Sequence, residues 1–210
     1  IEITNECLTA DKGEPSISKL SGGNRYRLRG TCSQPAELIS KPIEEPGAFF
    51  ADALRTHLAA RGIAIDGRIR REKWTFSEAE ARPIACHRTP IEDVLSRINK
   101  NSQNLFAECL CKCSGRKYEQ ARGRNVPGSW ESGGQALRAF LRKSGIDDAA
   151  LVPVDGSGLS PANRTSARML TDLLKVMSSR PDAETYRNSL TIAGVDGSLR
   201  DCMKDLKGRV

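Results

Sequence analysis

The sequence predicts a mixed α/β fold of the α+β type, in which a strand-rich start precedes a helix-rich remainder. Residues 1–45 are rich in Gly, Pro, Ser and Thr and contain short runs of alternating polarity, as strands joined by turns do. Farther along the chain, apolar residues recur every three or four positions, the period of a helix with one buried face. The 210 residues suffice for the core of one large domain, or of one domain plus part of another.

The composition is that of a soluble globular protein. Hydrophobic residues make up 38% of the chain and charged residues 28%, which argues against wholesale disorder. No run approaches the roughly 20 apolar residues that cross a bilayer. The first residues, IEITNECLTADKGEP, lack Met and the basic and apolar regions of a signal peptide, so we expect residue 1 to be an internal cut.

The net charge of +7 raises the question of an anionic partner, because clustered Lys and Arg concentrate anions. The basic residues are scattered, however, and no aromatic residues interleave their short runs as on a base-stacking surface. We therefore expect no nucleic-acid partner.

Seven cysteines are an odd number, so at least one has no partner within this chain. Cys109, Cys111 and Cys113 alternate with other residues, whereas structural zinc sites space their ligands more widely and use separate loops. We expect the three to lie in one helix, where Cys109 and Cys113 share the apolar stripe and pack as small hydrophobes. No metal or cofactor is expected.

The first 69 residues predict two kinds of element in succession. Alternating residues predict strands at Ile1–Ile3 and Tyr26–Arg29. Apolar residues at helical spacing predict a helix over Gly47–Arg61, with Gly62 as its stop. A further strand is predicted at Ile63–Ile69.

The next helix is predicted to begin at Thr89 and to end near Asn99. Thr89 and Glu92 have the spacing of a capping box, and Pro90 suits the first helical position. A new apolar stripe follows, so Ser102 is expected at the junction of two helices, where a side chain can face a cleft.

The last hundred residues continue the alternation of helices and loops. A Gly- and Arg-rich loop is predicted over Gly115–Gly134, a helix near Gln135–Lys143, a short strand at Leu151–Val154 and a helix over Ser166–Met177.

Four blocks of sequence together resemble one family. The block Ile98–Glu108, INKNSQNLFAE, contains a Ser-x-Asn at Ser102 and Asn104. A bare Ser-x-Asn is common by chance, but three more blocks follow in order: Val126–Trp130 (VPGSW), Val154–Ser160 (VDGSGLS) and Ala193–Arg200 (AGVDGSLR). In sequence and spacing they resemble the PBP4-like D-alanyl-D-alanine carboxypeptidases, the S13 peptidases among the low-molecular-mass penicillin-binding proteins. The resemblance is good from about residue 49 to 210 and loose over residues 1–45.

The resemblance implies a fold and a domain organisation. The fold would be that of the penicillin-recognising serine hydrolases (β-lactamase/transpeptidase-like), an antiparallel sheet flanked by helices. Residues 1–62 would be the end of an inserted β-rich domain, and residues 63–210 part of the catalytic domain.

The resemblance also implies an activity: serine-type D-Ala-D-Ala carboxypeptidase acting on peptidoglycan stem peptides through an acyl-enzyme, with endopeptidase activity left open. Penicillin-type β-lactams would inhibit it, and its location would be extracytoplasmic, as in the periplasm. Two alternatives stay open. One is a catalytically inert module that binds peptidoglycan or serves a structural role, and the other, weaker one is a binder of nucleic acid or another anionic polymer, whose affinity would fall steeply with salt.

The family uses Ser-x-x-Lys, Ser-x-Asn and Lys-Thr-Gly motifs, and this chain is expected to carry only the second. Ser16–Lys19 spells Ser-x-x-Lys, but it precedes a Gly-Gly turn and a strand instead of opening a helix, so we interpret it as a coincidence. The chain ends at Val210, just before the position of Lys-Thr-Gly in the resembling family. The chain alone is therefore expected to be inactive.

The resemblance assigns roles to Ser102 and Asn104. Ser102 would relay a proton between the nucleophile's lysine and the leaving amine, and Asn104 would hold the substrate backbone and brace that lysine. The residues by themselves also allow Ser102 to be a helix N-cap.

Asp155 and Ser157 are weaker candidates. They would support the cleft or, as the local sequence favours, belong together with Ser160 to a turn in which Gly156 and Gly158 supply positive φ.

Overall fold

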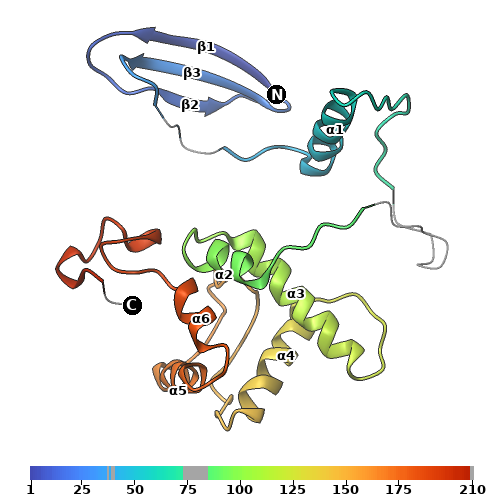
Figure 1. Ribbon diagram of the computed structural model, residues 1–210, viewed down its shortest axis with the longest axis vertical. Helices are drawn as coiled ribbons and strands as arrows, with labels where there is room; N and C mark the ends of the chain where they lie inside the picture. The colour runs from blue at the N-terminus through green and yellow to red at the C-terminus, as the bar shows by residue number, and fades with distance from the viewer. Residues whose placement is uncertain (37, 39–40, 73–84, 209–210) are drawn as a thin grey trace. The chain divides into compact units, whose positions relative to one another are not determined.

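The computed structural model describes residues 1–36, 38, 41–72 and 85–208 and divides into two compact units, Ile1–Pro83 and Ile84–Val210 (Figure 1). The two units are described separately. In the described ranges, no helix combines the length and the apolar character that a membrane span requires.

The first unit contains a three-stranded mixed sheet with the strand order β1-β3-β2. Strand β1 (Glu2–Thr9) runs parallel to β3 (Arg25–Cys32), and β2 (Ser16–Lys19) runs antiparallel to β3. The two predicted strands are confirmed and are longer than the alternating runs that predicted them. The Ser-x-x-Lys tetrapeptide lies in β2 and not at a helix start. Tyr26 on β3 is buried, and its hydroxyl donates to the carbonyl of Pro42 at 2.9 Å.

Helix α1 (Pro46–Ala59) confirms the first predicted helix, and Gly62 with a φ of 78° follows its end. None of the residues of α1, all of which are described, is buried. The strand predicted at Ile63–Ile69 was wrong, because this segment pairs with no other described segment and a strand needs a neighbour for its hydrogen-bond ladder.

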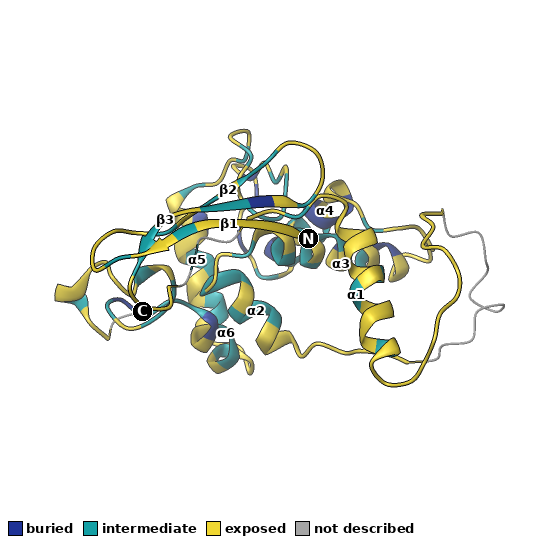
Figure 2. Cartoon of the chain, turned by 90° about the horizontal axis from the view of Figure 1, so that it is seen from above, coloured by how far each residue is buried: buried dark blue, intermediate teal, exposed yellow. Residues whose placement is uncertain are grey.

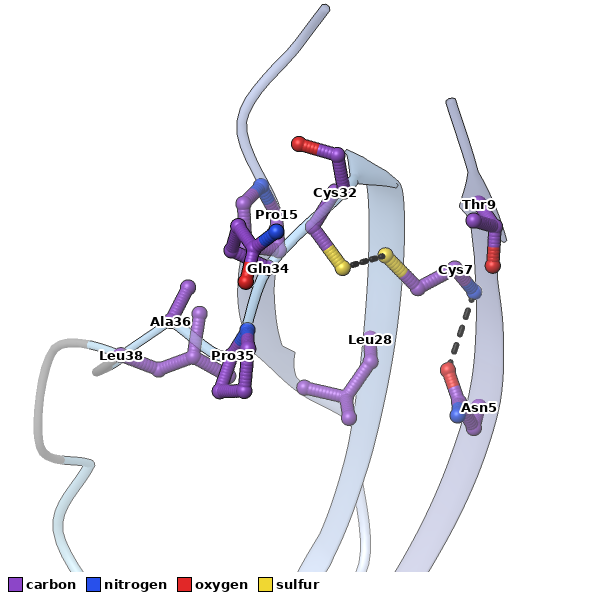
Figure 3. A pocket seen from close by; sticks show the side chains of 11 residues that line it. Asn5, Cys7, Thr9, Pro15, Leu28, Cys32, Gln34, Pro35, Ala36 and Leu38 are labelled. Carbon is purple, nitrogen blue, oxygen red and sulfur yellow. Dashed lines mark hydrogen bonds between the residues drawn. The ribbon is translucent and has the colours of Figure 1, made fainter. Parts of the chain in front are cut away.

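A pocket of about 350 Å³ lies beside the sheet of the first unit, and Leu28 and Pro35 are among its lining residues (Figure 3). Cys7 on β1 and Cys32 on β3 point toward each other there, with their Sγ atoms 3.9 Å apart. Burial and the neighbouring Cys32 raise the pKa of the Cys7 thiol.

The second unit is helical (Figure 1). Its core consists of Leu141, Ile146, Leu151 and Met169, with Phe140, Leu173 and Val176 packed against it. The helices are α2 (Ile91–Asn99), α3 (Asn104–Gln120), α4 (Trp130–Lys143), α5 (Ala167–Ser178) and α6 (Ala183–Ser189), followed by the 3₁₀ helices η1 (Gly197–Leu199) and η2 (Lys204–Leu206).

Helices α3 and α4 approach each other closely through glycines. A Cβ atom on Gly115 would lie 2.6 Å from the amide nitrogen of Gly133, and one on Gly133 would lie 2.4 Å from the Sγ atom of Cys111. The loop predicted over Gly115–Gly134 was therefore too long. These glycines serve close helix packing, and the connection is limited to residues 121–129.

The three neighbouring cysteines lie in α3, as predicted, but Cys109 and Cys113 are exposed. The cysteine that packs is Cys111, because α4 lies over its side of the helix.

Serine caps fix the first residues of α5 and α4. Ser166 caps α5 by accepting from the amide of Met169, so this helix is confirmed. Helix α4 begins five residues before the predicted Gln135, because Ser129 and Ser132 form a reciprocal capping box.

The capping box predicted at Thr89 was wrong. Pro90 is itself the N-cap of α2, and its ψ of 148° delays the first helical residue to Ile91. No side-chain hydrogen bond caps this end of α2 among the described residues.

The strand predicted at Leu151–Val154 is reduced to a single bridge between Val152 and Arg164. The Oδ1 atom of Asn163 accepts from the amides of Val154 and Asp155, which removes these donors from any ladder.

Candidate active site

Ser102 lies in the short turn between α2 and α3, at the helix junction that the sequence predicts. Its φ of 53° lies in the left-handed region, which a residue with a side chain seldom adopts. The N-cap of α3 is Gln103, so the N-cap interpretation of Ser102 was wrong, and Asn104 is the first helical residue. Strained backbone of this kind persists only where the surrounding structure holds it, and it concentrates at functional sites.

Backbone hydrogen bonds hold this turn from one side. The amide of Lys100 donates to the carbonyl of Ser96 at 2.9 Å, and the amide of Gln103 donates to that of Arg97 at 3.1 Å. The side chains of Ser102 and Asn104 are exposed and form no hydrogen bond with another described residue. A hydroxyl and an amide are thus available to a ligand.

The end of α6 and the chain that follows it hold the α2 end of the turn through side chains. The side-chain amide of Asn99 donates to the hydroxyl of Ser189 at 2.8 Å. The ammonium group of Lys100 pairs with the carboxylate of Asp196, whose other oxygen accepts from the amide of Ile192 at 2.8 Å.

Asp155 organises the turn that follows the Val152 bridge. Its carboxylate accepts from the amides of Gly158 and Ser160 at 2.8 and 2.7 Å and from the side chain of Asn163 at 2.9 Å. The Asn163 hydrogen bond is the main cause that lowers the pKa of Asp155. The turn interpretation is therefore confirmed for Asp155.

The two glycines of this turn differ in role. Gly158 adopts a φ of 79°, as expected of a turn glycine. Gly156 was expected to do the same but has no positive φ, and instead packs on α3, where a Cβ atom would lie 2.6 Å from the carbonyl oxygen of Ala107.

Glu108 joins this turn to α3. Its carboxylate accepts from the amides of Gly156 and Ser157 at 3.0 and 3.1 Å and from the indole of Trp130 at 2.6 Å. Hydrogen bonds from the Ser157 side chain, the Gly156 amide and Trp130 together lower the pKa of Glu108 to about 2. Because Asn104 and Glu108 are four residues apart, they share a face of α3. Glu108 therefore holds the turn that contains Gly156 and Ser157 on the same face as Asn104.

Sequence reasoning missed Glu108, although it closes the block that contains the Ser-x-Asn. It also missed Trp130, which is 47% exposed and lies under the ammonium of Lys112, 3.7 Å from the ring centroid. The spacing of Glu108 from Asn104 was the available signal.

The profile of the D-Ala-D-Ala carboxypeptidase 3 (S13) family matches residues 5–210. The chain belongs to this S13 family. A D-alanyl-D-alanine carboxypeptidase of Actinomadura sp. (strain R39) is 28% identical over 97% of the chain, and the carboxypeptidase DacB of Haemophilus influenzae is 24% identical over 95%. The chain spans 39% and 41% of the length of these two relatives.

Solved structures show the fold of this S13 chain. Penicillin-binding protein 4 of H. influenzae, in a crystal structure with a β-lactam, has a TM-score of 0.65 at 24% identity. The alignment covers 95% of this chain and 46% of that one. A second structure of the same protein has a TM-score of 0.62 at 21% identity. The expected fold class, that of the penicillin-binding proteins, is thereby confirmed.

Proposed function

We propose that this chain is part of a serine-type D-Ala-D-Ala carboxypeptidase that acts on the stem peptides of peptidoglycan. The observation that carries the proposal is the strained α2–α3 turn of an S13 chain, in which the side chains of Ser102 and Asn104 form no hydrogen bond with another described residue. The names of the two relatives given above support the same activity.

The reaction needs a proton at the leaving nitrogen. A serine oxygen bonds to the carbonyl carbon between two D-alanines, the C–N bond breaks, and the terminal D-alanine departs as an amine before water hydrolyses the ester. Ser102 would pass a proton to this amine, since a hydroxyl both donates and accepts. Asn104 would hold the substrate backbone with its amide. Asp155 and Ser157 would support this wall of the cleft from the neighbouring turn.

The nucleophile would come from outside these 210 residues. A nucleophilic serine needs a base beside it, and the ammonium of Lys100 is paired with Asp196. Ser16–Lys19 lies in β2, and a second Ser-x-x-Lys, at Ser114–Lys117, lies in the middle of α3. Neither begins a helix. The chain alone would therefore be inactive.

The domains and partners follow from the same proposal. Residues 1–62 would be the end of an inserted β-rich domain and residues 63–210 part of the catalytic domain. Stem peptides lie outside the cytoplasmic membrane, so the protein would act there, as in the periplasm. β-Lactams would acylate the same nucleophile, and hydrolysis of cross-links would be the second reaction to assay.

The test is release of D-alanine from a peptide ending in D-Ala-D-Ala by the full-length protein. We expect wild-type protein to release D-alanine and the Ser102→Ala variant to release it about 100- to 10,000-fold more slowly, the range for loss of a proton-transfer group. An inactive wild-type protein would favour a structural or peptidoglycan-binding module instead.

A further inference from the structure

The ion pair between Lys100 and Asp196 joins parts of the sequence that lie 96 residues apart. Lys100 directly follows the last residue of α2, and Asp196 precedes η1. Asp196 is itself fixed, because its second carboxylate oxygen accepts from the amide of Ile192. The carboxylate that pairs with Lys100 is thus held in place by a backbone hydrogen bond.

The residue after Asp196 packs against the same turn. Gly197 has a φ of 59°, and a Cβ atom there would lie 3.0 Å from the carbonyl oxygen of Lys100 and 2.4 Å from the Cγ2 atom of Thr191. Lys100 is therefore held twice, through its ammonium group by Asp196 and along its backbone by Gly197.

This double contact ends two residues before Ser102. Ser102 has a positive φ, and its side chain forms no hydrogen bond with another described residue that would hold it there. A strained conformation needs support from its surroundings. The contacts at Lys100 supply that support on the α2 side of the turn.

Burial distinguishes this pair from an ordinary surface pair. The side chains of Lys100 and Asp196 are 21% and 28% exposed, whereas Arg168 in the Arg168–Asp172 pair of α5 is 89% exposed. Exposed pairs contribute little to stability, whereas removing one partner of a pair withdrawn from water leaves the other charge without compensation.

We propose that Asp196 and Lys100 are positioning residues that hold the Ser102 turn in its reactive geometry. This inference rests on the proposed function of Ser102. Neither residue touches the substrate in this proposal. They act through the backbone of the turn, so their loss would slow the chemical step more than it weakens binding.

The test compares acylation of full-length variants by a reporter penicillin, with the binding constant and the acylation rate constant measured separately. Lys100→Met keeps the length of the side chain and removes its charge, and Lys100→Arg restores the charge. Arg168→Met is the matched control, because it removes an ion pair on an exposed helix face.

We expect Lys100→Met to lower the acylation rate constant about 10- to 100-fold, as small misplacements of catalytic groups do, with little change in binding. Asp196→Asn should have a similar effect, and the double variant should add little to either. Lys100→Arg should recover most of the rate, and Arg168→Met should keep it. If penicillin acylates the wild-type protein and acylates Lys100→Met at the same rate, the positioning role is overturned.

Hydrogen exchange separates failure of this inference from failure of the proposed function. We expect Lys100→Met to speed exchange of the amides of Asn101 and Gln103 in the full-length protein at least tenfold, and Arg168→Met to leave it unchanged. Faster exchange in a protein that penicillin does not acylate would support the role of Lys100 and Asp196 in holding the turn and contradict the proposed activity. Unchanged exchange in Lys100→Met would contradict the role of Lys100 and Asp196 in holding the turn.

Discussion

The two units differ in the interactions that stabilise each of them internally. In the first unit Tyr26 is the one buried hydrophobic residue among those described, and apolar side chains such as Leu8 and Phe50 are both 68% exposed. The second unit has a contiguous core around Leu141, which is 1% exposed. Figure 2 shows the contrast: α1 is exposed along nearly its whole length, whereas buried segments interrupt α3 and α4. Core packing thus holds α4 and α5 of the second unit, whereas the first unit depends on its hydrogen-bond ladder.

The largest difference should appear on truncation of a leucine in each unit. Leu141→Ala removes a side chain from the centre of the second unit's core and should lower the free energy of unfolding of that unit by about 2–5 kcal/mol. Leu8→Ala removes an exposed side chain and should change the free energy of unfolding of the first unit by less than about 0.5 kcal/mol. Urea unfolding of the full-length protein measures both, and equal effects would contradict the contrast between the units.

A covalent link should stabilise the first unit, whose described residues form no hydrophobic core cluster. Cys7 and Cys32 face each other from adjacent strands, so glutathione disulfide should oxidise the two thiols to one disulfide and itself be reduced to two glutathione molecules. The two cysteines are 25 residues apart, and closing a loop of that length should stabilise the unit by about 3.5 kcal/mol.

Peptide mapping would show the bond, and unfolding with and without reductant would measure its effect. Cys7→Ser should abolish the difference, whereas Cys113→Ser, at an exposed site in the other unit, should preserve it. Stability that does not depend on oxidation would contradict the prediction.

A smaller loss of stability should occur in the second unit when the pH is lowered. The pKa of Glu108 is about 2 in the folded chain against 4.5 ordinarily, and that of Asp148, beside Arg142 and Arg138, is about 2 against 3.8. A carboxylate whose pKa is lowered by folding stabilises the fold above its ordinary pKa, and this stability is lost as the pH falls toward the folded value. Stability should therefore decline from about pH 5 to pH 2.

Thermal unfolding across this range measures the decline, and Glu108→Gln should flatten the part due to Glu108. A variant with the full wild-type slope would show that the hydrogen bonds of Glu108 do not favour its ionised form.

Local patterns predicted the elements whose signals lie close together in sequence. The apolar spacing of α1 and the Ser166 cap of α5 act within a few residues, so the sequence contains them in full. The strand predicted at Ile63–Ile69 failed because pairing depends on a neighbouring strand that no local pattern reveals. The glycines of the α3–α4 crossing were assigned to a loop for the same reason, since their function is set by a partner helix.

The candidate site divides in the same way. The resemblance could propose Ser102 and Asn104 from the sequence because the motif is contiguous. The contacts that hold the motif span 48 residues from Glu108 to Gly156 and 96 from Lys100 to Asp196. Such pairs follow from the packing of helices, and a single sequence contains no record of which distant residues meet.

The central claim is that the α2–α3 turn belongs to a penicillin-reactive site. Labelling with a fluorescent penicillin tests it most directly, on the full-length protein, on its Ser102→Ala variant and on the 210-residue chain alone. The account predicts a labelled wild-type protein, at least about 100-fold slower labelling of Ser102→Ala and no labelling of the isolated chain. A full-length protein that takes up no label, or a Ser102→Ala variant labelled at the wild-type rate, would contradict it.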